Sequence, residues 1–202
     1  MKRNHCILAL MLLLLAPIVS IAQSDADAKV KTIAQSLRDP KNVEIRFDYH
    51  FTDAGKPTDA QQGKAYLQGE AYKILMNEQQ TISDGKTIWT YLIEDGEVLV
   101  SNATEGTDNT PLKLLTTLDK DYKASYAGTD MIELSNPKGD FKKILLKIDS
   151  KNNTLKTAEV FADDGGSMVI SILSTKFNQD LKDGFFTFDE KAHPGVDIID
   201  MR

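Results

Sequence analysis

The stretch from Thr81 to Val100 decides the fold, and it reads Thr81-Ile82-Ser83-Asp84-Gly85-Lys86-Thr87-Ile88-Trp89-Thr90-Tyr91-Leu92-Ile93-Glu94-Asp95-Gly96-Glu97-Val98-Leu99-Val100. Two Asp-Gly pairs separate short runs that are rich in β-branched and aromatic residues. Asp-Gly is typical of a two-residue hairpin, because a type I′ turn needs a positive φ angle at both central positions. The stretch therefore predicts three consecutive antiparallel strands, of which the middle one carries the only tryptophan, Trp89.

Further strands are predicted on both sides of this meander. The run from Val43 to Phe51 alternates apolar and polar residues, which predicts a strand with one apolar face. The run from Lys64 to Met76 is interpreted as one long strand, whose first face carries Tyr66, Gln68, Glu70, Tyr72, Ile74 and Met76. Short strands then recur from Tyr122 to Phe188. Many short strands without a βαβ rhythm favour a sandwich or a barrel.

Two segments have the apolar spacing of a helix. The first runs from Ser24 to Leu37 and carries an apolar stripe of Val30, Ile33, Ala34 and Leu37. The second begins at Thr110, which can cap it, and Pro111 takes its first position. Its apolar face consists of Leu114, Leu115 and Leu118. The sequence therefore predicts a mainly β chain with two helices.

The first 22 residues have the pattern of a secretory signal peptide. Lys2 and Arg3 give a positive start, and the run from Ile7 to Ile21 is apolar. Ser20-Ile21-Ala22 has the small-x-small pattern of a cleavage site. The apolar run is shorter than the roughly 20 residues that a membrane-spanning helix needs. We therefore expect cleavage at this site, with residues 23–202 as one mature domain.

Composition limits the partners of the mature chain. The sequence has a formal net charge of −6, and loss of Lys2 and Arg3 lowers this charge by two, to −8. An acidic domain binds nucleic acid and anionic membrane surfaces poorly. The single cysteine, Cys6, lies in the signal peptide. The mature chain therefore has no disulfide, no cysteine nucleophile and no thiolate metal ligand.

The motifs that commonly carry catalysis or bind metals are missing from this sequence. Gly85-Lys86-Thr87 is similar to the end of a phosphate-binding loop, but Gln80 stands where that motif needs its first glycine. His50 and His193 have no second histidine at ligand spacing. Asp163-Asp164-Gly165 lacks the spaced oxygen ligands of a calcium loop, and no Gly-x-Ser-x-Gly motif occurs. We therefore expect a protein that is not an enzyme and needs no metal or other cofactor.

Two apolar strand faces remain as the candidate binding surface. They consist of Phe47, Tyr49 and Phe51 on one strand and Tyr72, Ile74 and Met76 on another. Both faces can fill a core, or a half-open barrel crossed by a helix can leave an apolar cavity. Periodicity does not separate these two alternatives.

Three stretches occur in the order known from one family. They are Ile82-Ser83-Asp84-Gly85-Lys86-Thr87-Ile88-Trp89, then Asn109-Thr110-Pro111-Leu112, and then Phe186-Thr187-Phe188 followed by Pro194-Gly195-Val196-Asp197. They resemble the Ser-Asp-Gly-Lys-Thr-Leu-Trp segment, the turn into the internal helix and the Phe-x-Phe…Pro-x-Gly-Val ending of the outer-membrane lipoprotein carrier family, LolA. The resemblance covers essentially the whole mature chain, and the adjacent proline and glycine are a small departure.

The resemblance implies an unclosed antiparallel β-barrel with helices forming a lid over an apolar cavity. It implies a monomeric periplasmic chaperone, which takes acylated lipoproteins from an inner-membrane ABC transporter complex and delivers them to an outer-membrane acceptor. Such a carrier must cover the acyl chains, because each buried CH₂ group contributes ~0.8 kcal/mol. An envelope sensor, or a binding module for another lipid or a protein partner, would use the same fold, and this alternative stays open.

Strand parity and the resemblance together nominate the residues of the acyl cavity. They are Phe47, Tyr49, Tyr66, Tyr72, Ile74, Met76, Trp89, Leu114, Leu115 and Leu118. Gln68 stands where the family often has an inward arginine that hydrogen-bonds the lid. A neutral amide makes a weaker hydrogen bond than a charged group. We therefore expect a weaker contact between Gln68 and the lid.

Overall fold

The computed structural model describes residues 18–53, 55–103, 118–138, 141–163 and 165–202. The first part of the chain forms α1 (Ile18–Arg38), β1 (Val43–Asp53), β2 (Lys56–Pro57), β3 (Gln61–Gln68), β4 (Ala71–Leu75), β5 (Gln79–Ser83), β6 (Thr87–Leu92) and β7 (Glu97–Asn102). The second part forms α3 (Leu118–Asp121), β8 (Lys123–Gly128), β9 (Met131–Ser135), β10 (Lys143–Asp149), β11 (Thr154–Phe161), β12 (Ser167–Phe177), the 3₁₀ helix η1 (Glu190–Ala192) and β13 (Asp197–Asp200). No helix in the described ranges is long and apolar enough to cross a membrane.

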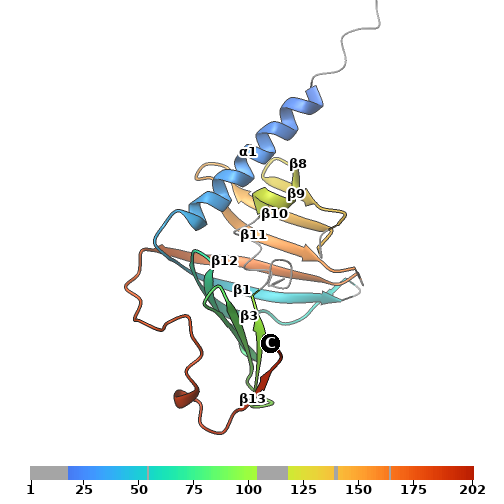
Figure 1. Ribbon diagram of the computed structural model, residues 1–202. Helices are drawn as coiled ribbons and strands as arrows, with labels where there is room; N and C mark the ends of the chain where they lie inside the picture. Colours follow the sequence, from blue (N-terminus) through green and yellow to red (C-terminus); the bar gives the residue numbers. More distant parts are fainter. Residues whose placement is uncertain (1–17, 54, 104–117, 139–140, 164) are drawn as a thin grey trace, which may run out of the picture.

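The strands of the described ranges form one open sheet (Figure 1). Their order is β13-β7-β6-β5-β4-β3-β1-β12-β11-β10-β9-β8, and β2 pairs with β1. Neighbours along this order are antiparallel, except that β13 runs parallel to β7. Because β8 and β13 end the order without pairing to each other, the sheet stays an unclosed half-barrel. The predicted fold class is confirmed.

The meander from Thr81 to Val100 forms as predicted, but its turns differ from the expected type. The backbone N–H of Asp84 donates to the carbonyl of Thr87 at 3.3 Å, so Gly85 and Lys86 are the central pair of the first turn. Gly85 has a positive φ of 89°, whereas Asp84 and Lys86 do not. The second turn is a four-residue loop, residues 93–96, and its last residue, Gly96, has a φ of 68°. The predicted type I′ turns are therefore wrong, since each glycine alone supplies the positive φ.

The segment predicted as one strand from Lys64 to Met76 is a hairpin of β3 and β4. Gly69 adopts a positive φ of 57°, and Gln68 pairs with Ala71 across the turn. Leu67 then lies opposite Tyr72, and Tyr66 lies opposite Lys73. Because paired residues share a face of the sheet, Tyr66 and Tyr72 lie on opposite faces. The prediction that they share one face is wrong, because it assumed an uninterrupted two-residue alternation across the turn at Gly69.

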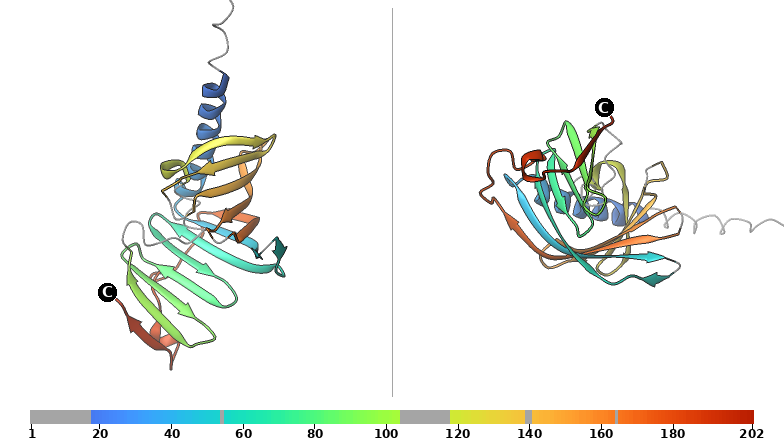
Figure 2. Two further views of the ribbon diagram at one scale, coloured as in Figure 1. Left: turned by 90° about the vertical axis from the view of Figure 1, so that its right-hand side faces the viewer. Right: turned by 90° about the horizontal axis from the view of Figure 1, so that it is seen from below.

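The inner face of the half-barrel, which we define as the face covered by α1, carries the main core (Figure 2). The helix contributes Ala26, Val30 and Ile33, whose 3- and 4-residue spacing forms one stripe. Leu118 of α3 packs into the same cluster. The sheet contributes alternate residues, among them Val43, Ile45, Phe47, Tyr49, Ala65, Leu67, Tyr72, Ile74, Ile132, Leu134, Ile144, Leu146, Ala158, Val160 and Ile170.

The outer face of the sheet, opposite α1, is covered in part by a C-terminal segment (residues 178–196). Asn42 holds the start of the segment: its Nδ2 donates to the Gln179 carbonyl at 2.9 Å, and its Oδ1 accepts from the Gln179 N–H at 2.8 Å. Phe188 then packs into a second apolar cluster with Ile82, Val98 and Val100. The sheet is thus packed on both faces, by α1 inside and by this segment outside.

Candidate functional site

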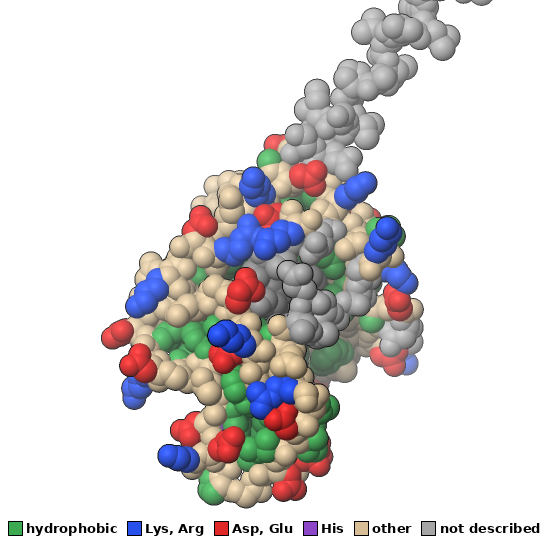
Figure 3. Space-filling view, viewed as in Figure 1, with side chains coloured by type: hydrophobic (Ala, Val, Ile, Leu, Met, Phe, Trp, Pro, Cys, Tyr) green, Lys and Arg blue, Asp and Glu red, His purple; other side chains and the backbone are tan. Residues whose placement is uncertain are grey.

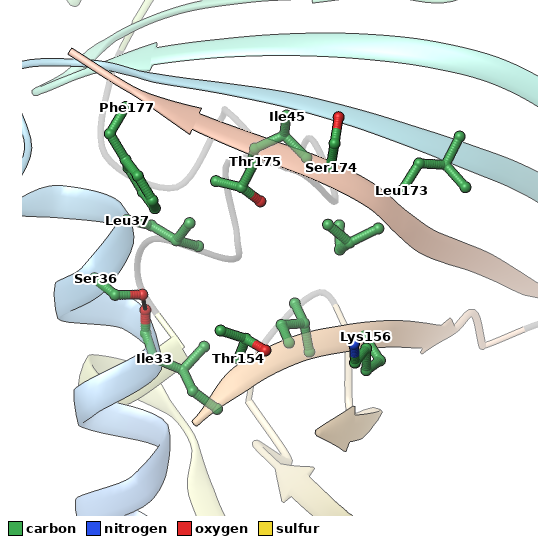
Figure 4. A pocket seen from close by; sticks show the side chains of 12 residues that line it. Ile33, Ser36, Leu37, Ile45, Thr154, Lys156, Leu173, Ser174, Thr175 and Phe177 are labelled. Atoms are coloured by element: carbon green, nitrogen blue, oxygen red, sulfur yellow. Dashed lines mark hydrogen bonds between the residues drawn. The ribbon is translucent and has the colours of Figure 1, made fainter. Parts of the chain in front are cut away.

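An open pocket of about 320 Å³ lies on the inner face, between the last turns of α1 and strands β1, β11 and β12 (Figure 4). Its apolar lining consists of Ile33, Leu37, Ile45, Leu155, Ile172, Leu173 and Phe177. Its polar lining consists of Ser36, Thr154, Lys156, Ser174 and Thr175. The pocket is therefore apolar with a polar border, as expected of a site that holds an apolar group and leaves a polar one outside.

The periodicity of two elements explains the walls of this pocket. Ile33 and Leu37 are four residues apart and so lie on one side of α1. Ser36 lies beside them, but its hydroxyl donates to the Ile33 carbonyl at 2.7 Å and is satisfied within the helix (Figure 4). On the opposite wall, Thr175 of β12 pairs with Ile45 of β1. Thr175 is short, so it leaves space that a larger residue would fill.

The pocket borders the main core. Ile33 and Ile45 belong to the core cluster, and Leu37, Leu155 and Ile172 pack against that cluster. A ligand in the pocket therefore contacts the side chains that hold α1 on the sheet. A longer apolar ligand can enter further only when α1 and the sheet move apart, because protein cores are close-packed.

Lys156 places a charged group at the border of the pocket. Its Nζ lies 3.4 Å from Oδ2 of Asp149, and the lysine side chain is about half exposed. A hydrogen bond from the backbone N–H of Lys151 lowers the pKa of Asp149, and Asn152 and Lys156 act in the same direction. The border thus carries an ion pair in contact with solvent, while the interior is apolar.

Arg38 and Asp119 join the two helices next to the pocket. Nη1 and Nη2 of Arg38 donate to the two carboxylate oxygens of Asp119 at 2.7 and 2.8 Å. This bidentate hydrogen bond lowers the pKa of Asp119 and raises the pKa of Arg38. Arg38 directly follows the pocket residue Leu37, so the ion pair fixes the end of α1 against α3.

The sequence matches the family model described as outer membrane lipoprotein carrier protein LolA over residues 75–189, more than half of the chain. The chain belongs to the LolA family. An outer-membrane lipoprotein carrier protein from Pasteurella multocida is 32% identical over 130 residues, which are 62% of this LolA-family chain and 62% of that relative. The alignment thus spans less than two thirds of the Pasteurella protein.

Two further comparisons concern a second carrier protein and a solved structure. An outer-membrane lipoprotein carrier protein from Haemophilus influenzae strain Rd is 28% identical over 160 residues, covering 74% of this chain and 76% of that protein. The crystal structure of an uncharacterized conserved protein from Thermus thermophilus superposes with a TM-score of 0.55 at 9% identity, covering 87% of this chain and 99% of that one. At this identity the structural likeness shows the fold alone.

Most of the cavity residues predicted from the LolA resemblance meet in the inner core. Phe47, Tyr49, Tyr72, Ile74 and Leu118 are buried in one cluster, and Met76 packs against it. None of them lines the pocket beneath α1, although Phe47 and Met76 line a second, more open pocket of about 460 Å³. Their role in binding acyl chains stays a prediction.

Tyr66 and Trp89 lie on the outer face, so the prediction that they face the inside is wrong. Tyr66 pairs with Glu44 and Lys73, and its ring contacts Phe185 of the C-terminal segment at 4.8 Å between centroids. Trp89 pairs with Ile82 and packs on the second cluster with Phe188. For Tyr66 the error comes from the turn at Gly69. For Trp89 it comes from strand parity and the resemblance, because parity separates the two faces of β6 but does not show which of them lies toward α1.

Gln68 is exposed at the end of β3, on the face that carries Tyr66. Its predicted contact with a lid stays a prediction. Leu114 and Leu115 lie outside the described residues, together with most of the helix predicted from Thr110.

Sequence reasoning missed most of the pocket beneath α1. Ile33 and Leu37 belong to the predicted helical stripe, but no sequence pattern indicates that the C-terminal end of this stripe borders an open pocket. Leu155 and Phe177 are also missing from the predicted cavity. Their signal was the alternation along β11 and β12, which predicts a face but not the partner across it.

Proposed function

We propose that this LolA-family chain is a periplasmic carrier that binds the acyl chains of lipoproteins beneath α1. In this proposal, a signal peptide in residues 1–22 directs export and is cleaved. The carrier then takes lipoproteins from an inner-membrane ABC transporter complex to an outer-membrane acceptor. The observation that carries the proposal is the apolar pocket, which is open to solvent and shares lining residues with the inner core.

The free energy of transfer supports an apolar chain as the ligand. Each CH₂ group removed from water contributes ~0.8 kcal/mol, so a cover over an acyl chain is strongly favourable. The pocket of about 320 Å³ is at the small end for ligand sites. We therefore infer that it accepts the first part of a chain, and that further chain length is taken up as α1 moves from the sheet.

Binding can be tested with protein purified from periplasmic extract after export. A fluorescent fatty acid is bound first and is then displaced by a synthetic triacylated lipopeptide. We expect Phe177→Glu and Leu155→Glu to weaken binding at least tenfold, because each places a charge in the apolar lining. Ile93→Glu is the matched control, since Ile93 is exposed in the β6–β7 turn, and it should bind as the wild type does.

Circular dichroism and thermal unfolding must show that each variant is folded. Phe177 is 46% exposed, so its replacement is the less disruptive of the two. A folded wild type that binds neither the fatty acid nor the lipopeptide would overturn the proposal. Equal weakening by Ile93→Glu would show that added charge, and not the pocket, is responsible.

Transport is a separate test from binding. Inner-membrane vesicles that hold a newly made lipoprotein and its transporter are incubated with ATP and the purified chain. The proposal predicts a soluble complex of lipoprotein and carrier, which is reduced in the Phe177→Glu variant. If the chain binds acyl ligands but releases no lipoprotein from the vesicles, the carrier function is rejected. A lipid-binding module is then the remaining interpretation.

A further inference from the structure

Among the strands that the structure describes, β13 forms one edge of the sheet and pairs with β7 alone. The N–H groups of Asp197 and Met201 donate to the carbonyls of Gly96 and Val100 at 2.9 and 2.8 Å. In a parallel pair, alternate residues direct both backbone groups to the neighbouring strand. Ile198 and Asp200 therefore direct their N–H and C=O groups away from β7, toward the side where no strand of the described ranges pairs with β13.

The other end of the sheet is protected. At β8 the Asp27 carboxylate of α1 accepts the backbone N–H of Ala124 at 2.9 Å. Asp25 of the same helix accepts the hydroxyl of Tyr126 at 2.7 Å. A helix that covers an edge in this way prevents another strand from pairing there. β13 has no such cover among the described residues, so the two edges of the sheet differ.

Apolar side chains project from both faces of β13. Ile198 is 42% exposed and pairs with Val98 on the outer face, while Ile199 is 40% exposed and pairs with Leu99 on the inner face. Met201 is 59% exposed. In the lower lobe of the molecule, apolar surface lies beside several acidic side chains (Figure 3). An added strand would cover these side chains and pair the free backbone groups at the same time.

The charges next to this edge select the partner. Asp197 lies opposite Glu97, and the preceding turn adds Glu94 and Asp95. No ion pair of the described residues involves any of these four carboxylates. Acidic groups without counter-charges attract a basic segment and repel a second copy of the same edge. Self-pairing through β13 is therefore disfavoured.

We propose that β13 is a docking edge, to which a basic, extended segment of a partner protein adds as a further strand. The edge is well separated in the strand order from β12, which lines the pocket beneath α1. Docking here does not depend on acyl binding, so the proposed edge and the proposed carrier function can fail separately. The partner segment has alternating apolar and Lys or Arg residues.

A peptide probe tests the docking edge in the exported, purified protein labelled with ¹⁵N. The probe is a capped octapeptide of alternating lysine and valine. We expect saturable binding that slows amide hydrogen exchange at Ile198 and Asp200 at least tenfold and weakens in high salt. Two control peptides should bind at least tenfold more weakly. One has glutamate in place of lysine, and the other has two adjacent N-methylated residues at its centre, which removes a donor from each of its edges.

Two variants of the protein complete the test. Ile198→Pro removes an N–H group that points away from β7, so the ladder between β13 and β7 keeps its donors. We expect this variant to lose at least tenfold in peptide affinity, and Ile198→Ala, which keeps the donor, to lose less. Chemical shifts of β6 and β7 report whether β13 stays in place. If Ile198→Pro displaces β13, the comparison of the three peptides on the wild type decides alone.

Several results would overturn the proposal. One is unchanged exchange at Ile198 and Asp200 with millimolar lysine–valine peptide. Another is equal affinity for the glutamate peptide, because the acidic border would then play no part. A third is slower amide exchange at Ile198 and Asp200 when the protein concentration alone is raised. A second copy of the chain would then be the partner that binds this edge.

Discussion

The ring of Phe47 occupies the space that a side chain at Gly63 would need. The two residues pair between β1 and β3, and a Cβ atom built on Gly63 would lie 2.3 Å from Cζ of Phe47. Phe47 is fully buried, so a side chain added at Gly63 would have to displace its ring. We expect Gly63→Ala to lower the free energy of unfolding by about 1–3 kcal/mol, through overpacking of the inner core. Urea denaturation followed by circular dichroism measures this change.

Gly128→Ala is the control for this substitution. A Cβ atom on Gly128 would lie 3.7 Å from its nearest neighbour, which is ordinary contact. We expect a change of less than about 1 kcal/mol in either direction. Equal effects of the two substitutions would show that the loss of glycine itself, and not the Phe47 ring, sets the stability.

The Arg38–Asp119 ion pair predicts a pH-dependent attachment of the helices. The pKa of Asp119 is lowered in the folded state, chiefly by the hydrogen bond from Arg38. The contribution of the Asp119 carboxylate to the free energy of unfolding is therefore fully present above its unfolded pKa of about 3.9. It is lost as the pH falls through the lower folded pKa. We expect Asp119→Asn to cost about 1–2 kcal/mol at pH 7. The difference from the wild type should shrink below about pH 4.

Asp163→Asn serves as the matched comparison. Lys142 and Asp163 form an ion pair at 2.8 Å, but both side chains are more than half exposed. Surface pairs of this kind contribute roughly 0–1 kcal/mol. Unfolding measured from pH 7 to pH 3 should show a larger and more pH-dependent loss for Asp119→Asn. The reverse ranking would contradict a structural role for the Arg38–Asp119 pair.

Tyr66 and Tyr72 should differ in how strongly their truncation destabilises the chain, because they lie on opposite faces of one hairpin. Tyr72 is fully buried in the inner core, so Tyr72→Ala should cost about 3–5 kcal/mol. Tyr66 mainly contacts Phe185, and Tyr66→Ala should cost about 1–2 kcal/mol and leave acyl binding unchanged. Thermal unfolding and fatty-acid titration of both variants check this. Weaker acyl binding in a fully folded Tyr66→Ala variant would contradict the placement of Tyr66.

Trp89 provides a direct optical signal from the outer face, since it is the only tryptophan. Removal of the Phe188 ring exposes the cluster on which Trp89 packs, so Phe188→Ala should shift its fluorescence to longer wavelength. Phe186→Ala is the control, because Phe186 contacts Phe185 and is not part of this cluster. An acyl ligand beneath α1 should leave the emission maximum unchanged. A shift on adding ligand would place the acyl chain on the outer face.

Local signals in the sequence predicted the strands well, and the error at Tyr66 arose where one glycine ended a strand. The alternation from Val43 to Phe51 predicted the inner and outer faces of β1, because that strand has no turn. From Lys64 to Met76 the same reasoning failed at Gly69, whose positive φ reverses the chain. A glycine followed by a polar residue was the available turn signal.

The candidate site was less predictable than the fold, because it depends on distant pairings. The lining brings together Ile33 of α1, Leu155 of β11 and Phe177 of β12. Periodicity predicts which side of each element is apolar, but not which elements face one another. The resemblance to a known family supplied the half-barrel and its lid, and it did not supply the position of the opening beneath α1.

The pairing of β1 with β12 also has a consequence for the rate of folding. Val43 meets Phe177, and Thr52 meets Ser167, so this junction joins segments from opposite ends of the chain. The hairpins from β3 to β7 and from β8 to β12 close over short loops, whereas the junction must close over most of the sequence. Since long loops delay non-local contacts, we expect the hairpins on each side of this junction to form first. The pairing of β1 with β12 should then limit the rate of folding. Until that step is complete, each half exposes an unpaired strand, β1 or β12, and must be kept from aggregating.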